Sequence, residues 1–195
     1  MKTTLISTSI LLVVLISCTN PKIQNKSQAI KLNRLRHIIH ETKFIALPYV
    51  FDATRNHIKG YHLDASTPDS LVFSSSCFTI INCFPDTTNY FAFLFGESGD
   101  MLYPGIITFD KSGKLISKEI ISTCNCLTNP RVDTESCFDS VIIGKDLSIL
   151  SYSKLKATIQ PFDTSNVTFD ASSEEKLTGR INSNGLVEIE KGEKK

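Results

Sequence analysis

The sequence lacks an apolar run long enough to cross a membrane. Its N-terminal apolar stretch, Leu5–Ile16, covers 12 residues and is interrupted by Ser7, Thr8 and Ser9. A transmembrane helix needs roughly 20 apolar residues, so this stretch is too short to span the hydrocarbon core. Its length is typical of the apolar part of an export signal, and Lys2 supplies the positive charge that precedes such a part.

The chain also has almost no net charge. The formal charge is +1, which argues against a nucleic acid as partner, and we expect none. Trp is absent, but 12 Phe, 5 Tyr and 41% apolar residues are enough for a folded core. A disordered stalk is therefore excluded.

Motifs that identify a reaction are missing as well. The sequence contains no G-x-S-x-G elbow, no H-E-x-x-H pair, no phosphate loop ending in G-K-[ST] and no C-x-x-C zinc pair. We therefore expect no cofactor and favour a non-catalytic role over an enzymatic one.

One motif is present. Leu15-Ile16-Ser17-Cys18 resembles the lipobox of bacterial lipoproteins. This resemblance implies that residues 1–17 are a signal peptide and that Cys18, carrying diacylglycerol and palmitate, becomes the new N-terminus. An ordinary secretory leader with an incidental cysteine is the alternative. Thr19 in place of Asp, and the absence of an acidic run, indicate the outer membrane of a Gram-negative bacterium, on its periplasmic face.

The mature chain divides into a tether and one domain. Residues 18–27 are expected to be flexible, residues 28–190 to form a single β-rich domain, and residues 191–195 to fray. Apolar residues at helical spacing predict a helix over residues 28–42. The segment from Thr19 to Lys43 carries six basic residues against Glu41 alone. Such a segment either attracts anionic lipid headgroups or is simply a solvated tether.

Beyond this helix, turn residues recur every 8 to 12 positions, which is typical of antiparallel β proteins. We expect a mainly β fold, with hairpins or a meander forming a sandwich or an open barrel after one N-terminal helix; α+β remains an alternative. Tight turns are predicted at residues 110–113, 144–146 and 182–185. Tyr90–Phe95 is apolar at every position, so it should be buried on both faces or lie at a sheet centre. The segment around Pro48 should be an edge strand or be broken there.

With Cys18 acylated, five cysteines remain for disulfides in an oxidising compartment: Cys77, Cys83, Cys124, Cys126 and Cys137. The sequence does not decide their connectivity. Proximity favours Cys77 with Cys83, and Cys137 with Cys124 or Cys126. A thiol or metal site on the Cys124-x-Cys126 pair is the functional alternative.

The histidines provide only weak candidates for chemistry. His57, His62 and Asp64 form a potential metal or His–carboxylate group, because residues 62 and 64 share a face if extended. His37, His40 and Glu41 share a helical face. Both groups also fit ordinary surface residues.

Two expected strands flank the segment DKSGK at residues 110–114, and the pattern G-x-I-x-x-x-G closes the domain at residues 179–185. With these patterns, residues 90–190 diffusely resemble small uncharacterised envelope lipoproteins, and the resemblance implies a β-rich fold and no activity. We therefore hypothesise a lipid-anchored envelope protein that binds or shields an envelope partner through an edge strand or an exposed aromatic patch. A metal- or thiol-dependent envelope enzyme and an inhibitor or immunity lipoprotein are the alternatives.

Overall fold

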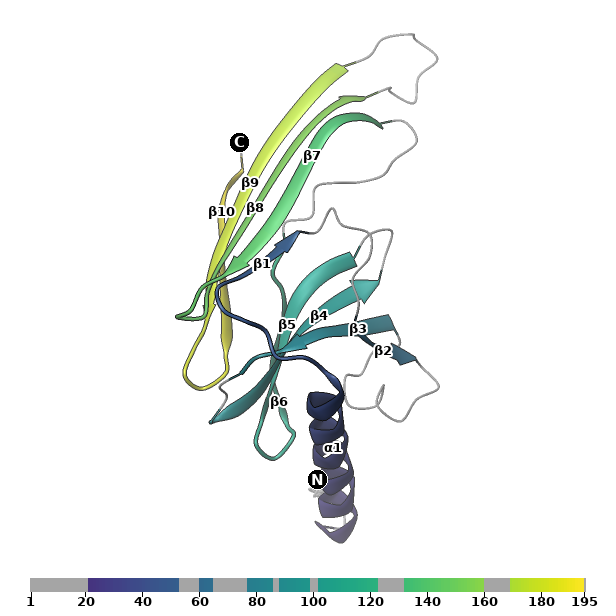
Figure 1. The fold of residues 1–195 in the computed structure, drawn as a ribbon. Coiled ribbons are helices and arrows are strands. Elements are labelled where there is room, and N and C mark those ends of the chain that lie inside the picture. The colour runs from purple at the N-terminus through teal and green to yellow at the C-terminus, as the bar shows by residue number, and fades with distance from the viewer. Residues whose placement is uncertain are drawn as a thin grey trace, which may run out of the picture.

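The structure is a computed structural model that describes residues 21–52, 60–64, 77–85, 88–98, 102–122, 132–159 and 169–194. In these segments ten strands form two five-stranded antiparallel sheets, preceded by one helix (Figure 1). The sheets face one another as a sandwich and do not close into a barrel. The prediction of a mainly β fold with one N-terminal helix is confirmed.

The first sheet, called here the central sheet, is a meander in chain order. Its strands are β2 (Tyr61–Asp64), β3 (Cys77–Cys83), β4 (Tyr90–Ser98), β5 (Leu102–Asp110) and β6 (Leu115–Ile120). The second, the long-strand sheet, has the order β1-β7-β8-β9-β10. Its strands are β1 (Tyr49–Asp52), β7 (Val132–Ile143), β8 (Ser148–Ile159), β9 (Phe169–Ile181) and β10 (Val187–Lys194).

The central sheet is covered on both faces. Helix α1 (Pro21–Glu41) packs Leu35 and Ile38 onto one face, against Phe93 and Phe95 of β4. The opposite face, which includes Leu94, joins the core shared with the long-strand sheet. Since β4 lies in the middle of this sheet, both parts of the prediction for residues 90–95 are confirmed.

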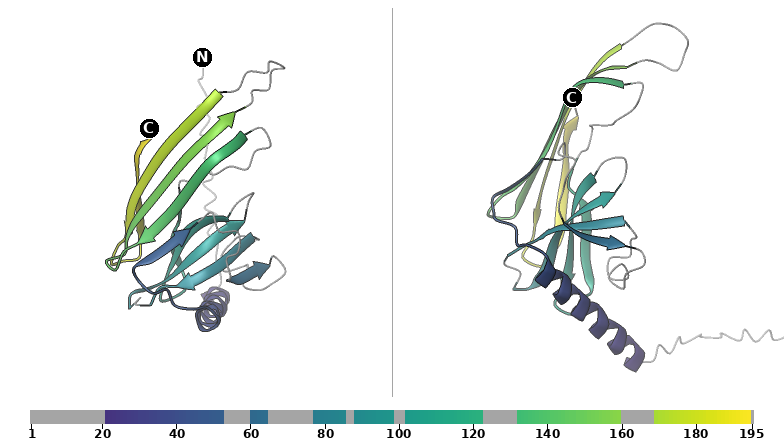
Figure 2. Two further views of the ribbon diagram at one scale, coloured as in Figure 1. Left: turned by 45° about the horizontal axis from the view of Figure 1, so that its top comes forward. Right: turned by 45° about the vertical axis from the view of Figure 1, so that its right-hand side comes forward.

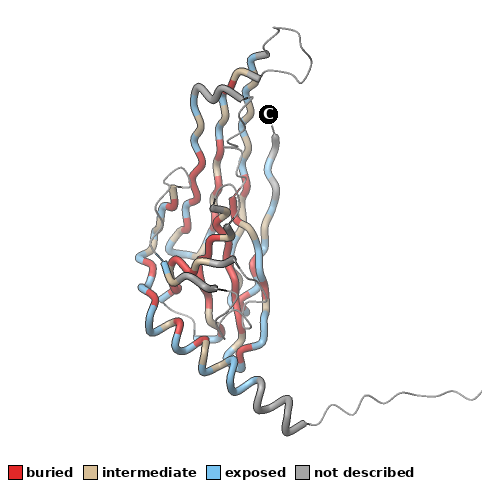
Figure 3. Tube along the Cα trace, turned by 90° about the vertical axis from the view of Figure 1, so that its right-hand side faces the viewer, coloured by how far each residue is buried: buried red, intermediate tan, exposed pale blue. Residues whose placement is uncertain are grey.

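The long-strand sheet is covered by the sandwich over only part of its length. Figures 1 and 2 show β7, β8 and β9 continuing well past the central sheet. We call the part of β7, β8 and β9 that continues past the central sheet the overhang. In Figure 3 buried residues are densest where the layers overlap.

Three hairpin turns join the strands as predicted. They connect β5 to β6, β7 to β8 and β9 to β10. Gly113 and Gly185 have φ values of +88° and +87°, a backbone region in which a side chain would be strained. Gly185 also approaches Tyr90 so closely that an added Cβ would lie 2.9 Å from its ring. The β9–β10 turn therefore packs tightly on the central sheet.

Several boundaries differ from the prediction, beginning with the tether. Helix α1 begins at Pro21, so residues 21–27 are helical and not a flexible tether. Proline is well suited to the first turn, where its missing N–H would have no helical partner anyway.

The strands at the C-terminal side are long. β8 is continuous from Ser148 to Ile159, and β9 extends back to Phe169. β10 reaches Lys194, because Lys194 pairs with Glu175 of β9. The expected fraying after residue 190 is therefore wrong for residues 191–194.

Candidate functional site

The outer face of the long-strand sheet carries large apolar side chains in solvent. Val50, Ile142 and Leu150 lie opposite one another on β1, β7 and β8, and Val50 is 62% exposed. Sheets with one solvated face normally place polar residues there. An apolar row at the β1–β7 side of this face is a departure from that pattern.

Two aromatic rings extend the row toward the overhang. Phe138, 51% exposed, lies 6.1 Å from the ring of Tyr152 between centroids. Burial first, and then the negative charge and hydrogen bond of the Glu174 carboxylate, raise the pKa of Tyr152 above its ordinary value. The Tyr152 hydroxyl is thus held to Glu174 on β9. We call Val50, Phe138, Ile142, Leu150 and Tyr152 the outer apolar patch.

The patch borders a part of β7 with which no described strand pairs on the β1 side. β1 pairs with β7 at residues 140–143, while β8 pairs with β7 from Val132 to Ile143, with a register shift between Thr134 and Ser136. In the part of the chain that the structure describes, no strand pairs with residues 132–139 on the β1 side. Alternate backbone N–H and C=O groups of an antiparallel strand point to each side, so this edge presents hydrogen-bonding groups.

The inner face of β7 changes from apolar to polar at the start of the overhang. Val141 and Ile143 belong to the core, whereas the next inward residue is Asp139. Asp139 is fully buried and its Oδ2 accepts a 2.8 Å hydrogen bond from Ser122 Oγ. Since Ser122 follows β6, this bond ties β7 to the central sheet at the end of residues 132–139.

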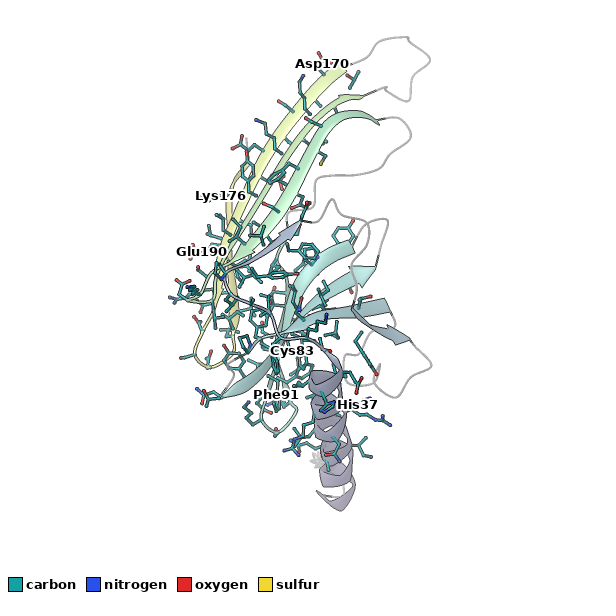
Figure 4. All side chains as sticks on the ribbon, viewed as in Figure 1. His37, Cys83, Phe91, Asp170, Lys176 and Glu190 are labelled. Carbon is teal, nitrogen blue, oxygen red and sulfur yellow. The ribbon has the colours of Figure 1, made fainter. Side chains whose placement is uncertain are left out.

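A hollow lies where the end of α1 meets the central sheet. It has a volume of about 320 Å³. Figure 4 places Cys83 and Phe91 in this region. Its lining is almost entirely apolar: Ile39, Phe44, Cys83, Phe84, Pro85, Thr88, Phe91 and Ala92.

Cys83 in this hollow is a buried free thiol. Burial raises its pKa to about 12, and the nearby Thr42 side chain offsets only part of this effect. A thiol must lose its proton to act as a nucleophile, so Cys83 is chemically inert near neutral pH.

The expected bridge between Cys77 and Cys83 is therefore wrong. The two residues lie at opposite ends of β3. At roughly 3.3 Å per residue along a strand, their Cα atoms are about 20 Å apart. A disulfide needs Cα atoms within about 7 Å of each other. Cys137 is disulfide-bonded, and its expected partners Cys124 and Cys126 lie outside the described residues.

The histidine candidates are only partly placed. His57 lies outside the described residues. His62 and Asp64 belong to β2, opposite Thr79 and Cys77, and their side chains are not described.

On α1, the ring of His37 packs edge-on against Tyr61 at 6.4 Å. His40 Nδ1 lies 3.5 Å from Glu41 Oε1, with both side chains largely in solvent. Within the described segments, no three His, Cys, Asp or Glu side chains are grouped so that they would hold a metal ion.

The outer apolar patch was not identified by residue from the sequence. The run Tyr49-Val50-Phe51 did contain a signal, because adjacent apolar residues of a strand point to opposite faces. Phe51 takes the core face, which leaves Val50 outside. For Phe138 no such signal exists until the register of β7 is known.

No protein-family model, curated protein or solved structure matches the chain. Over the described residues, no helix has the length and apolar character needed to span a membrane.

Proposed function

We propose that this protein is a lipid-anchored envelope protein that binds an extended segment of another envelope protein along β7. The observation that carries the proposal is the edge of β7 over residues 132–139, with which no strand pairs on the β1 side among the described residues, beside the exposed ring of Phe138. An edge of this kind is a template for an added strand, in which backbone hydrogen bonds provide affinity and side-chain contacts provide specificity.

The geometry of β1 supports this mode of binding. β1 already pairs antiparallel with residues 140–143 of β7, and it is only four residues long. A bound segment would continue the line of β1 along residues 132–139. Its outward side chains would lie next to Phe138 and extend the outer apolar patch.

The charge of the edge indicates the chemistry of the bound segment. Asp133 and Glu135 are the only charged residues in positions 132–138. A segment that alternates apolar and basic residues would complement them, whereas a second copy of β7 would place acid against acid. The partner is therefore a different protein with a basic, extended stretch.

The anchor at Cys18 fits the position of α1. The helix begins three residues after Cys18 and, at 21 residues, is about 30 Å long. Figure 2 shows it extending away from the sheets. Its early residues, such as Ile30 and Lys31, are exposed, while contacts with the core begin at Leu35. A helix of this kind would hold the sandwich away from the bilayer.

Lipidation is tested by metabolic labelling with a fatty-acid analogue. We expect label on the wild type and none on Cys18→Ala. A variant that is still labelled and still bound to the membrane would contradict the anchor.

Partner binding is tested in cells with a photoreactive phenylalanine at position 138. The matched control carries it at Leu186, which is 39% exposed on the β9–β10 turn. We expect a discrete protein adduct from position 138 only, with a basic and alternately apolar peptide at the cross-link.

Reversing the edge charge with Asp133→Lys and Glu135→Lys should lower that adduct roughly tenfold, because two attractive pairs become repulsive. Equal adducts from both positions, an acidic peptide at the cross-link, or an adduct unchanged by charge reversal would each contradict the proposal.

A further inference from the structure

The hollow at the end of α1 is built from segments that are far apart in the sequence. Ile39 comes from the last turn of the helix and Phe44 from the segment that follows it. The end of β3 and the start of β4 supply the rest of the wall. Phe44 is 58% exposed although it lines an apolar hollow, so a large ring is kept partly in solvent. A ligand in the hollow would cover it.

A positive charge stands at the margin of this hollow. Lys111 Nζ lies 4.1 Å from the centroid of the Phe91 ring, and Phe91 is part of the wall. Lys111 is placed by the β5–β6 turn, in which Asp110 Oδ1 accepts hydrogen bonds from Ser112 N and Lys114 N. The turn that carries Lys111 is therefore structured, and its ammonium group lies over a ring of the apolar wall.

Size and charge together define the ligand. A volume of about 320 Å³ is at the lower end of the roughly 300–1,000 Å³ of small-molecule sites. It offers room for a single hydrocarbon chain, whereas a diacyl lipid presents two chains. An apolar chain in the hollow would bring a terminal carboxylate within reach of the Lys111 ammonium.

We propose that this hollow binds one fatty-acid molecule, with its chain among Phe44, Phe84 and Phe91 and its carboxylate at Lys111. The site is separate from the β7 edge, so it can fail or hold independently of the proposed function. Binding is non-covalent, because the Cys83 thiol in the wall is protonated near neutral pH and is not a nucleophile.

The test uses the full-length protein in lipid nanodiscs and decanoic acid carrying a diazirine. We expect photoadducts at residues of the hollow, Phe44 and Phe91 foremost. Unlabelled saturated acids should compete about fourfold better for each added methylene until the hollow is full, after which the gain should stop. Competition that keeps improving with chain length would contradict a site whose volume limits the length of the bound chain.

Charge recognition is tested with Lys111→Glu and the matched control Lys114→Glu. Both residues are exposed in the same turn, but only Lys111 stands over Phe91. We expect labelling by the acid to fall at least about fivefold in Lys111→Glu and to stay unchanged in Lys114→Glu. Circular dichroism should show the same thermal transition for both variants.

Three further results would overturn the proposal. The first is equal labelling of the two variants. The second is a methyl ester of the probe that labels as strongly as the acid. The third is a lysophospholipid that displaces the probe better than decanoate, since it would assign the site to a phospholipid instead of a free fatty acid.

Discussion

The two sheets of this protein bury their strands in different ways. In β4 of the central sheet, Phe93, Leu94 and Phe95 are all fully buried in succession. In β8 of the long-strand sheet, Ser151 and Ser153 are buried while Tyr152 between them is half-exposed. The first pattern requires a layer on both faces, and the second requires a layer on one. Among the described residues, the centre of the central sheet is therefore buried on both faces, whereas the long-strand sheet leaves one face in solvent.

The largest difference in the free energy of unfolding should appear between alanine variants of one aromatic residue from each sheet. Phe93→Ala removes a fully buried ring and should lower the free energy of unfolding by about 3–5 kcal/mol. Phe138→Ala removes a ring that is 51% exposed and should lower the free energy of unfolding by about 1 kcal/mol or less. Urea unfolding measures both. Similar losses of stability would contradict the difference between the sheets.

The hydrogen bond that joins the sheets should give a smaller effect. Thr108 Oγ1, fully buried on β5, donates to the Gly185 carbonyl at 2.7 Å in the β9–β10 turn. Thr108→Val leaves that carbonyl unsatisfied and should cost about 1–3 kcal/mol. Thr178→Val on β9 of the long-strand sheet serves as the control and should change stability by less than about 0.5 kcal/mol. An equal loss of unfolding free energy in the two variants would contradict a stabilising role for the Thr108–Gly185 hydrogen bond.

Burial of Cys83 in the central sheet predicts a dependence on alkaline pH. Its pKa is about 12 in the folded protein, against an ordinary value of 9.0. The folded state therefore holds the proton longer, so the stability due to this group is complete below pH 9 and is lost as pH rises toward 12. Between pH 9 and 10 the wild type should lose about 1 kcal/mol more than Cys83→Ala in urea unfolding. Parallel curves for the two proteins would contradict the burial of the thiol.

The smallest effects on stability should come from the hairpin turns. In these turns the two sheets are alike, because each turn lowers the pKa of one Asp. In the β7–β8 turn, hydrogen bonds from Ser148 lower the pKa of Asp146. In the β5–β6 turn, partial burial acts in the opposite direction, but bonds from Ser112 and Lys114 still lower the pKa of Asp110.

Both carboxylates thus favour folding above their unfolded pKa of about 4, and this contribution is lost as pH falls through the lower folded value. Ser148→Ala should raise the pKa of Asp146 in an NMR titration and leave that of Asp110 unchanged. A shift at Asp110 instead would contradict the assignment of these bonds.

The features that were predictable from the sequence are those set by local chemistry. Gly113 and Gly185 define turns because of their backbone freedom, and Tyr90–Phe95 identifies a central strand because polar residues are absent from it. These predictions depend only on residues that are neighbours in the sequence, and the structure confirms them.

Features set by distant pairing were not predictable in the same way. β9 runs through a polar stretch because Ser172, Ser173 and Glu174 each pair with a residue of β8. Proximity in sequence suggested that Cys77 would reach Cys83, but one continuous strand separates them. The exposed site at Phe138 depends on the same kind of information, because the register of β7 decides which of its residues face solvent.

The most direct test of the proposed function is amide hydrogen exchange at single-residue resolution. The full-length protein in nanodiscs would be mixed with an eight-residue peptide of alternating Lys and Val, and then with a peptide of alternating Glu and Val. We expect the basic peptide to slow exchange at alternate amides of residues 132–139 and to leave β10 unchanged. Equal protection by the acidic peptide, protection along β10, or no protection of β7 would contradict strand addition at this edge.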